Sequence, residues 1–178
     1  MQMDEGLDTG DMLHISRCSI SDTETSASLY NKLAELGPSA LIDTVNKLAN
    51  GDITPEPQND ELANYAKKLS KEEANIDWSM SAVQIERNVR SFNPWPVCFT
   101  QMGEQTVKIY QAKVVDQSGK PGEILTSDKN GVVVACGEHA LSITQLQPQG
   151  KKPMAISDFL NGRSDWVSPG TLLGENNE

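Results

Sequence analysis

The stretch VCFTQMGEQTVKIYQAKVV, residues 97–115, decides the fold of the larger part of this chain. From Val97 onward the residues follow a period of two, which is typical of a strand that buries one face. Gly103-Glu104 interrupts this pattern with the composition of a two-residue hairpin turn. The stretch therefore predicts two antiparallel strands, residues 97–102 and 105–115, joined by a tight turn.

Three more short strands follow this hairpin. They are EILTS, VVVAC and ALSITQLQ, residues 123–127, 132–136 and 140–147. Asn130-Gly131 is a strong hairpin signal between the first two, and Gly137-Glu138 separates the second from the third. Five short strands in about fifty residues predict a small closed barrel, OB-like in type.

Helices are predicted on both sides of this barrel. Ser81 and Gln84 have the spacing of a capping box, which satisfies free N–H groups at a helix start. The helix then runs to about Phe92 with an apolar face, and FNPWP (residues 92–96) ends it. A second, short helix is predicted near residues 155–160, and an irregular tail follows it.

The first third of the chain has a different organisation. Residues 11–20 predict a strand, and Ser21 and Glu24 form a capping box that starts a helix over 23–36. Gly37-Pro38 stops that helix, and Pro38 opens a second one that Gly51 ends. Two amphipathic helices and one strand are too few to bury their own apolar faces. This part is therefore expected to be the remnant of an α/β domain whose main sheet is missing.

A proline-containing segment, residues 52–64, separates the two parts. Pro55 and Pro57 favour extended backbone and block a helix. The predicted organisation is a remnant over 1–51, a linker over 52–64 and a barrel domain over 65–178. The fold class is α+β.

Charge and composition limit which kinds of partner this chain can bind. The net charge is -10, and residues 1–60 carry eleven acidic and three basic residues, so the acidity belongs to the first third. An anionic partner for the rest is therefore compatible with the acidic total, because local patches decide attraction. No apolar run approaches the ~20 residues that span a bilayer, so no membrane partner is expected.

The cysteines and histidines predict neither a metal site nor a disulfide framework. The three cysteines, Cys18, Cys98 and Cys136, are widely spaced and form no C-x-x-C pair. They are expected to be reduced, buried thiols of a cytoplasmic protein. The only histidines are His14 and His139, for which a strand or surface position and a turn are expected.

Five segments occur in an order that points to one family. They are MDEGLDTGDM (3–12), YAKKLSKEEANIDW (65–78), RSFNPWP (90–96), KPGEIL (120–125) and QGKKPM (149–154). Together they resemble the methionyl-tRNA formyltransferases, across essentially the whole chain. The resemblance implies formyl transfer from 10-formyltetrahydrofolate to initiator methionyl-tRNA, with no metal, no DNA partner and a monomeric intact enzyme.

The resemblance also implies that the chain is a C-terminal portion of such an enzyme: the end of its Rossmann-like catalytic domain, a linker and its OB-like tRNA-binding domain. The family's upstream half holds an Asn-x-His pair of the active site and a loop that probes the tRNA acceptor stem. No N-x-H occurs in the 178 residues. Met1 is accordingly expected to be an internal methionine, and this chain alone is expected to be inactive.

Asp8 matches the family's catalytic aspartate, which orients and charges the histidine. Leu7 and Asp8 are also expected to edge the folate pocket. On spacing alone, Asp8 is better explained as an acidic turn residue beside Gly10, and only the resemblance favours the catalytic role. Asp4 is assigned to a turn or to solvent.

Basic residues along the second part are candidates for tRNA phosphates, which bind Lys and Arg without requiring a fixed order. They are Lys67, Lys68, Lys71, Arg87, Arg90, Lys151 and Lys152. The tryptophans could stack on bases, although core packing is the stronger expectation for Trp78 and Trp95.

Two alternatives remain at this point. One is a fragment of another folate-dependent formyltransferase, such as a sugar-nucleotide enzyme, against which KLSKEEANIDW together with FNPWP argues. The other is a stand-alone, non-catalytic RNA-binding module, which the missing Asn-x-His pair favours.

Overall fold

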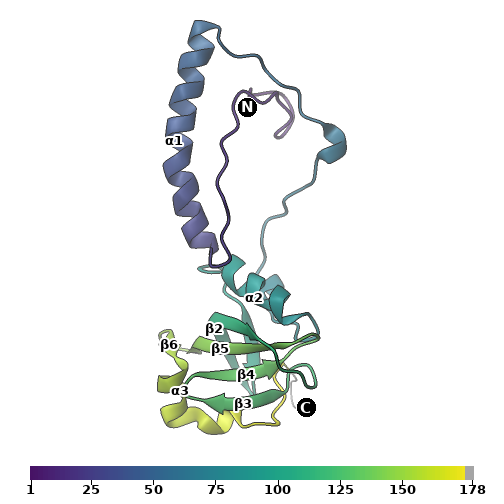
Figure 1. Cartoon of the computed structure of the whole chain (residues 1–178), viewed down its shortest axis with the longest axis vertical. Helices are drawn as coiled ribbons and strands as arrows, with labels where there is room; N and C mark the ends of the chain where they lie inside the picture. The colour runs from purple at the N-terminus through teal and green to yellow at the C-terminus, as the bar shows by residue number, and fades with distance from the viewer. Residues whose placement is uncertain (175–178) are drawn as a thin grey trace. The chain divides into compact units, whose positions relative to one another are not determined.

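A computed structural model describes residues 1–174 of the chain (Figure 1). Contacts divide it into two compact units, Met1–Lys68 and Leu69 to the end of the described residues. Each unit is described by itself below. The second unit contains nearly all of the buried apolar side chains, and the first is built around one long helix.

The second unit is built on one six-stranded antiparallel sheet (Figure 1). The strand order is β1-β2-β5-β4-β3, and β6 pairs with β5. The strands are β1 (Phe99–Met102), β2 (Gln105–Val115), β3 (Ile124–Asp128), β4 (Gly131–Ala135), β5 (Ala140–Pro148) and β6 (Met154–Ala155). The five predicted strands are confirmed, and β6 is an addition. The turn before β4 differs by one residue from the prediction: Lys129-Asn130 make it, and Gly131 already pairs with Asp128.

The helices of the second unit are η2 (Glu72–Ala74), α2 (Ala82–Ser91), α3 (Ile156–Arg163) and η3 (Ser164–Val167). Helices α2 and α3 pack on the sheet, and η3 contacts β3. The Ser81 Oγ accepts from the Gln84 N–H at 3.2 Å, so Ser81 caps α2 as predicted. The predicted capping box is wrong, because the Gln84 side chain bonds Asn88 at 2.9 Å instead of returning to Ser81.

The core lies between α2, α3 and the inward faces of the strands. Ile85 and Val89 of α2 are buried, as are Ile109 of β2 and Ile143 of β5. Trp78 is also buried and donates its indole N–H to the Thr100 hydroxyl at 3.0 Å, which confirms its predicted core position. Trp95 was expected in the core, and this is wrong: it is 51% exposed. It lies between two cis X-Pro bonds, Asn93-Pro94 and Trp95-Pro96.

The strands alone do not close the predicted barrel, because the two outer strands, β1 and β3, do not pair with each other within residues 1–174. The segment Gly170–Gly174 instead forms backbone hydrogen bonds with both of these strands. The Gly170 N–H bonds the Ile124 carbonyl at 2.8 Å, and the Gly174 N–H bonds the Gln101 carbonyl at 3.1 Å. The Leu173 N–H donates to the Gly122 carbonyl at 2.9 Å, and the Leu173 side chain is buried. The predicted irregular tail is therefore, up to Gly174, a bridge between the sheet edges, and its last four residues lie outside the described part.

The first unit contains α1 (Ser26–Asn50) and the short η1 (Asp60–Leu62). The prediction of two helices broken at Gly37-Pro38 is wrong, because α1 is continuous and carries Pro38 inside it. A proline removes one N–H donor from the helix ladder. No residue of α1 is buried, so water can satisfy the carbonyl that loses its partner. The predicted end of the helix is confirmed, since Gly51 adopts a left-handed φ of 76° as the C-cap.

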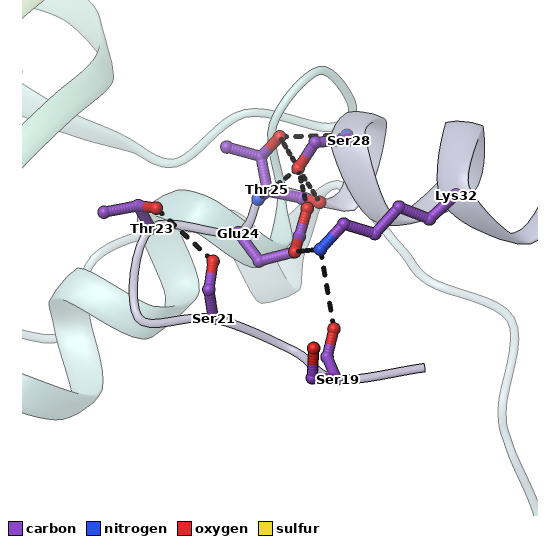
Figure 2. Close-up of polar contacts among 7 residues, drawn as sticks. All are labelled: Ser19, Ser21, Thr23, Glu24, Thr25, Ser28 and Lys32. Carbon is purple, nitrogen blue, oxygen red and sulfur yellow. Dashed lines mark hydrogen bonds and ion pairs between the residues drawn. The ribbon is translucent and has the colours of Figure 1, made fainter. Parts of the chain in front are cut away.

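The start of α1 also differs from the prediction, as Figure 2 shows. Thr25 is the N-cap, and its hydroxyl accepts from the Ser28 N–H at 3.2 Å. The Ser28 hydroxyl in turn accepts from the Thr25 N–H at 3.0 Å. Glu24, expected in a box with Ser21, instead accepts from Ser28 and pairs with Lys32. These partners lower the pKa of the Glu24 carboxyl, the Lys32 ammonium first and the Ser28 hydroxyl second.

The predicted strand over residues 11–20 is wrong. Within the described residues the segment forms only an isolated bridge, in which Met12 and Glu56 exchange backbone hydrogen bonds of 2.8 and 2.9 Å. A strand needs a neighbour along its length to pair its N–H and C=O groups. Residues 1–68 offer such a neighbour at one position only.

Candidate functional site

The loop over Met1–Met12 is held in shape through its backbone. The Gln58 Nε2 donates to the carbonyls of Asp8 and Gly10, both at 2.7 Å. Gly10 lies so close to the Gln2 carbonyl that a Cβ there would stand 2.0 Å from its oxygen. Asp8 has a φ of 58°, a left-handed conformation that Asp tolerates better than most residues. Gln58 and Gly10 together therefore fix the path of the chain at Asp8.

Asp4 serves this turn, as expected. Its carboxylate accepts from the Glu5 N–H at 2.8 Å and from the Thr9 hydroxyl at 3.3 Å. The side chains of Leu7 and Asp8 lie on the exposed side of the same loop, and Leu7 is 90% exposed. The loop thus presents an apolar side chain beside a carboxylate.

His14 does not approach the Asp8 carboxylate. Its imidazole is bonded to the Ser16 hydroxyl at 2.9 Å and lies 3.9 Å from the Asp43 carboxylate. His139 lies in the second unit, 3.4 Å from the Asp116 carboxylate, in a left-handed turn conformation. The described residues therefore bring no histidine to Asp8.

The predicted RNA-contact residues fall into three places. Lys67 and Lys68 are exposed and belong to the end of the first unit, in a stretch without helix or strand. Lys71 is exposed in the second unit and precedes η2. Arg87 is exposed on α2, whereas Arg90 pairs with Glu86 through an Nε–Oε1 distance of 2.7 Å. That carboxylate partly neutralises Arg90.

Lys151 and Lys152 are exposed in the turn between β5 and β6. Beside this turn lies an open surface groove of about 420 Å³, lined by residues of β2 and of the end of β5. Lys108 lines it and was not among the predicted residues. The period of two along β2 is the signal that could have found Lys108, because it places Lys108 on the outward face between buried Val107 and Ile109.

The three cysteine thiols differ in their exposure to solvent. Cys98 and Cys136 are buried as predicted, and burial raises the pKa of their thiols to about 12 and about 11. Cys18 was expected to be buried, and this is wrong, since it is exposed.

The described residues contain no helix long and apolar enough to cross a membrane. They also contain no group of three or more His, Cys, Asp or Glu side chains positioned for a metal ion.

Comparison with known proteins gives a consistent result over both parts of the chain. Residues 68–164 match the family described as formyl transferase, C-terminal domain, and residues 1–45 match formyl transferase. The chain is 81% identical over 182 residues to a methionyl-tRNA formyltransferase of Pseudoalteromonas translucida (strain TAC 125). The match covers 100% of this chain and 57% of that protein, so the chain spans little more than half of its relative.

Solved structures share the fold at low sequence identity. A structure of HypX from Aquifex aeolicus in complex with tetrahydrofolic acid superposes with a TM-score of 0.63 at 21% identity, covering 88% of this chain and 28% of that one. An N-formyltransferase from Helicobacter canadensis, in complex with folinic acid and dTDP-3-aminofucose, superposes with a TM-score of 0.60 at 14% identity, covering 79% and 52%. On the match over residues 68–164, this chain belongs to the formyl transferase family.

Proposed function

We propose that this chain is the C-terminal portion of a methionyl-tRNA formyltransferase, which transfers a formyl group from 10-formyltetrahydrofolate to the amino group of initiator methionyl-tRNA. The observation that carries the proposal is the 81% identity to such an enzyme over the whole chain. In this proposal residues 1–51 complete the catalytic domain and 52–64 link it to an OB-like tRNA-binding domain over 65–178. The intact enzyme is a cytoplasmic monomer.

Asp8 is the proposed catalytic residue of this chain. In formyl transfer the amine nitrogen attacks the formyl carbon, a tetrahedral oxyanion forms, and the amine loses a proton as the bond to the folate nitrogen breaks. A carboxylate orients the neighbouring imidazole and stabilises its charged form, as in the Ser-His-Asp arrangement. The fixed backbone at Asp8 and its exposed side chain, bonded to no other side chain of residues 1–174, suit that role.

Leu7 and Asp8 are the proposed contribution of this chain to the folate site. An exposed apolar side chain beside a carboxylate fits the edge of a pteridine ring, which has an apolar face and polar N–H groups at its rim. Leu7 and Asp8 line none of the cavities described in this chain. In this proposal they therefore supply only one edge of the folate site. The formyl group and its carrier are substrates in this scheme.

A chimera tests the catalytic proposal. The part of the Pseudoalteromonas enzyme that precedes the matched region is fused to Met1, and formylation of charged initiator tRNA is measured. In this background Asp8→Asn should lower turnover by about 10²–10⁴-fold, the usual contribution of a positioned acid–base group.

The matched control is Asp4→Asn in the same loop. Asn keeps one oxygen that can accept from the Glu5 N–H, and its amide NH2 can donate to the Thr9 hydroxyl oxygen, so turnover should stay within a few fold. Equal losses of turnover in the two variants would show that Asp8 serves only the structure of the turn and would contradict its catalytic role. An inactive chimera that is folded and binds tRNA would favour the non-catalytic RNA-binding module.

The second proposed activity of this chain is binding tRNA phosphates through Lys67, Lys68, Lys71, Arg87, Arg90, Lys151 and Lys152. Each phosphate contact contributes about 0.7–0.9 to the slope of log affinity against log salt. Replacing Lys68 and Lys71 by alanine should lower that slope by about one to two units for unrelated RNAs alike. Titration of tRNA at several salt concentrations measures it, and an unchanged slope would show that these lysines are only solvated.

A further inference from the structure

The groove between β2 and the β5–β6 turn is lined mainly by polar residues. Its lining residues are Thr106, Lys108, Gln147, Pro148, Gln149 and Gly150. Lys108 and Gln147 are direct partners across the β2–β5 pair, so their side chains share one face of the sheet. Neighbouring Val107 and Leu146 are buried on the opposite face. The register therefore fixes Lys108 at the groove.

Hydrogen bonds connect β2, the end of β5 and the β5–β6 turn beside the groove. The Tyr110 hydroxyl donates to the Gln147 Oε1 at 3.0 Å. The Gln147 Nε2 donates to the Lys151 carbonyl at 2.6 Å, and the Lys151 N–H donates to the Pro148 carbonyl at 3.1 Å. One glutamine thus ties the strand β2 to the turn that carries Lys151 and Lys152. The left-handed φ of 71° at Gly150 completes the turn.

Lys108 is the one charged side chain among the residues that line the groove. No carboxylate lines it. Lys108, Lys151 and Lys152 take part in no ion pair in the part of the chain that the structure describes. This contrasts with Arg90, whose guanidinium is paired with Glu86. A chain of net charge -10 thus keeps one unpaired lysine in this groove and two more in the turn beside it.

We infer that this groove seats a segment of RNA backbone, with Lys108 as a phosphate contact and the Tyr110–Gln147 pair as the positioning element for the Lys151-Lys152 turn. The inference rests on the proposed function and extends it to residues outside the predicted set. Ammonium groups contact phosphates, while the Thr106 hydroxyl and the Gln149 amide offer partners for phosphate and sugar oxygens. Such a groove reads backbone and not base sequence, so the binding should be similar for unrelated RNAs.

Titration of unmodified tRNA against the full 178-residue chain, at several salt concentrations, tests this. Lys108→Gln removes the charge and should lower the affinity and reduce the salt slope by about 0.7–0.9. Tyr110→Phe removes only the hydroxyl that holds Gln147. It should lower the affinity by about two- to fivefold, the worth of one hydrogen bond, and leave the salt slope unchanged.

The control is Lys129→Gln, which makes the same charge change in the β3–β4 turn and should leave both quantities as in the wild type. Equal unfolding midpoints for all variants show that the differences belong to binding. If the wild type binds and only Lys68→Ala with Lys71→Ala weakens it, the groove inference fails and the proposed function stands. If the wild type shows no salt-dependent binding at all, the RNA-binding proposal falls and the groove inference falls with it. A Lys129→Gln effect equal to that of Lys108→Gln would show general attraction in place of a groove.

Discussion

Replacing Leu173 by alanine tests whether the segment Gly170–Gly174 holds the second unit together. Leu173 is only 3% exposed and belongs to the main core, and its N–H bonds the Gly122 carbonyl across the edge of β3. Gly122 has a φ of 86°, and a Cβ there would lie 2.9 Å from the Leu173 carbonyl oxygen. The two backbones are therefore in close contact, which limits how far either can move to refill a space.

The expected cost follows from what the substitution removes. Three buried carbons correspond to about 2–3 kcal/mol of lost transfer free energy. A residual cavity adds to this loss, so that the total reaches about 3 kcal/mol, within the roughly 2–5 kcal/mol range for Leu→Ala. A loss of about 3 kcal/mol lowers the unfolding midpoint of a domain near one hundred residues by roughly 10–20 °C.

Tryptophan fluorescence during thermal unfolding of the full chain measures this. All three tryptophans, Trp78, Trp95 and Trp166, belong to the second unit, so the first unit does not contribute to the signal. The matched control is Leu62→Ala, because Leu62 is exposed in the first unit and should leave the midpoint unchanged. A midpoint for Leu173→Ala within about 2 °C of the wild type, less than 1 kcal/mol, would refute the bridging role.

Three further outcomes are expected. A thiol reagent at pH 8 should label Cys18 alone in the native chain, because Cys98 and Cys136 are buried thiols with pKa values of about 12 and about 11; labelling of all three without denaturant would contradict their burial. Lys32 and Ser28 lower the pKa of Glu24, so their stabilisation of the α1 start is complete above the ordinary pKa of 4.5 and is lost as the pH falls through the lowered value. Helical circular dichroism should therefore decline on acidification less steeply in Glu24→Gln than in the wild type, and identical titrations would count against it. Limited proteolysis should cut within residues 59–69, which are exposed, and leave a resistant second unit, whereas equally slow amide exchange in both units would show the first unit to be as stable as the second.

Local patterns in the sequence predicted the second unit well, because every strand pair of its sheet except β2–β5 joins neighbours in the chain. The hairpin at Gly103-Glu104 brings β1 onto β2, and the period of two identifies the inward residues of both. Ser81 was predictable as the cap of α2 for the same reason, since a cap bonds a group three residues away. The prediction of a catalytic role for Asp8 rests on the five ordered segments of the family resemblance. The residue spacing around Asp8 by itself favoured a turn.

Long-range contacts decided what the sequence left open. Residues 11–20 have the alternation of a strand, and only the absence of a partner along residues 1–68 keeps them out of one. Pro38 has the local signature of a helix break, yet an exposed α1 tolerates the lost hydrogen bond.

Tertiary pairing also explains the three remaining differences. The tail residues carry no strand pattern, and the unpaired edges of β1 and β3 give Leu173 its place. Trp95 is a large aromatic residue of the kind expected in a core, yet it is 51% exposed because no other segment covers it fully. Lys108 gains its significance from Gln147, which is far away in sequence and opposite to it in the sheet. Periodicity and capping are properties of neighbours along the chain, whereas burial, edge pairing and a shared groove depend on which distant segments meet.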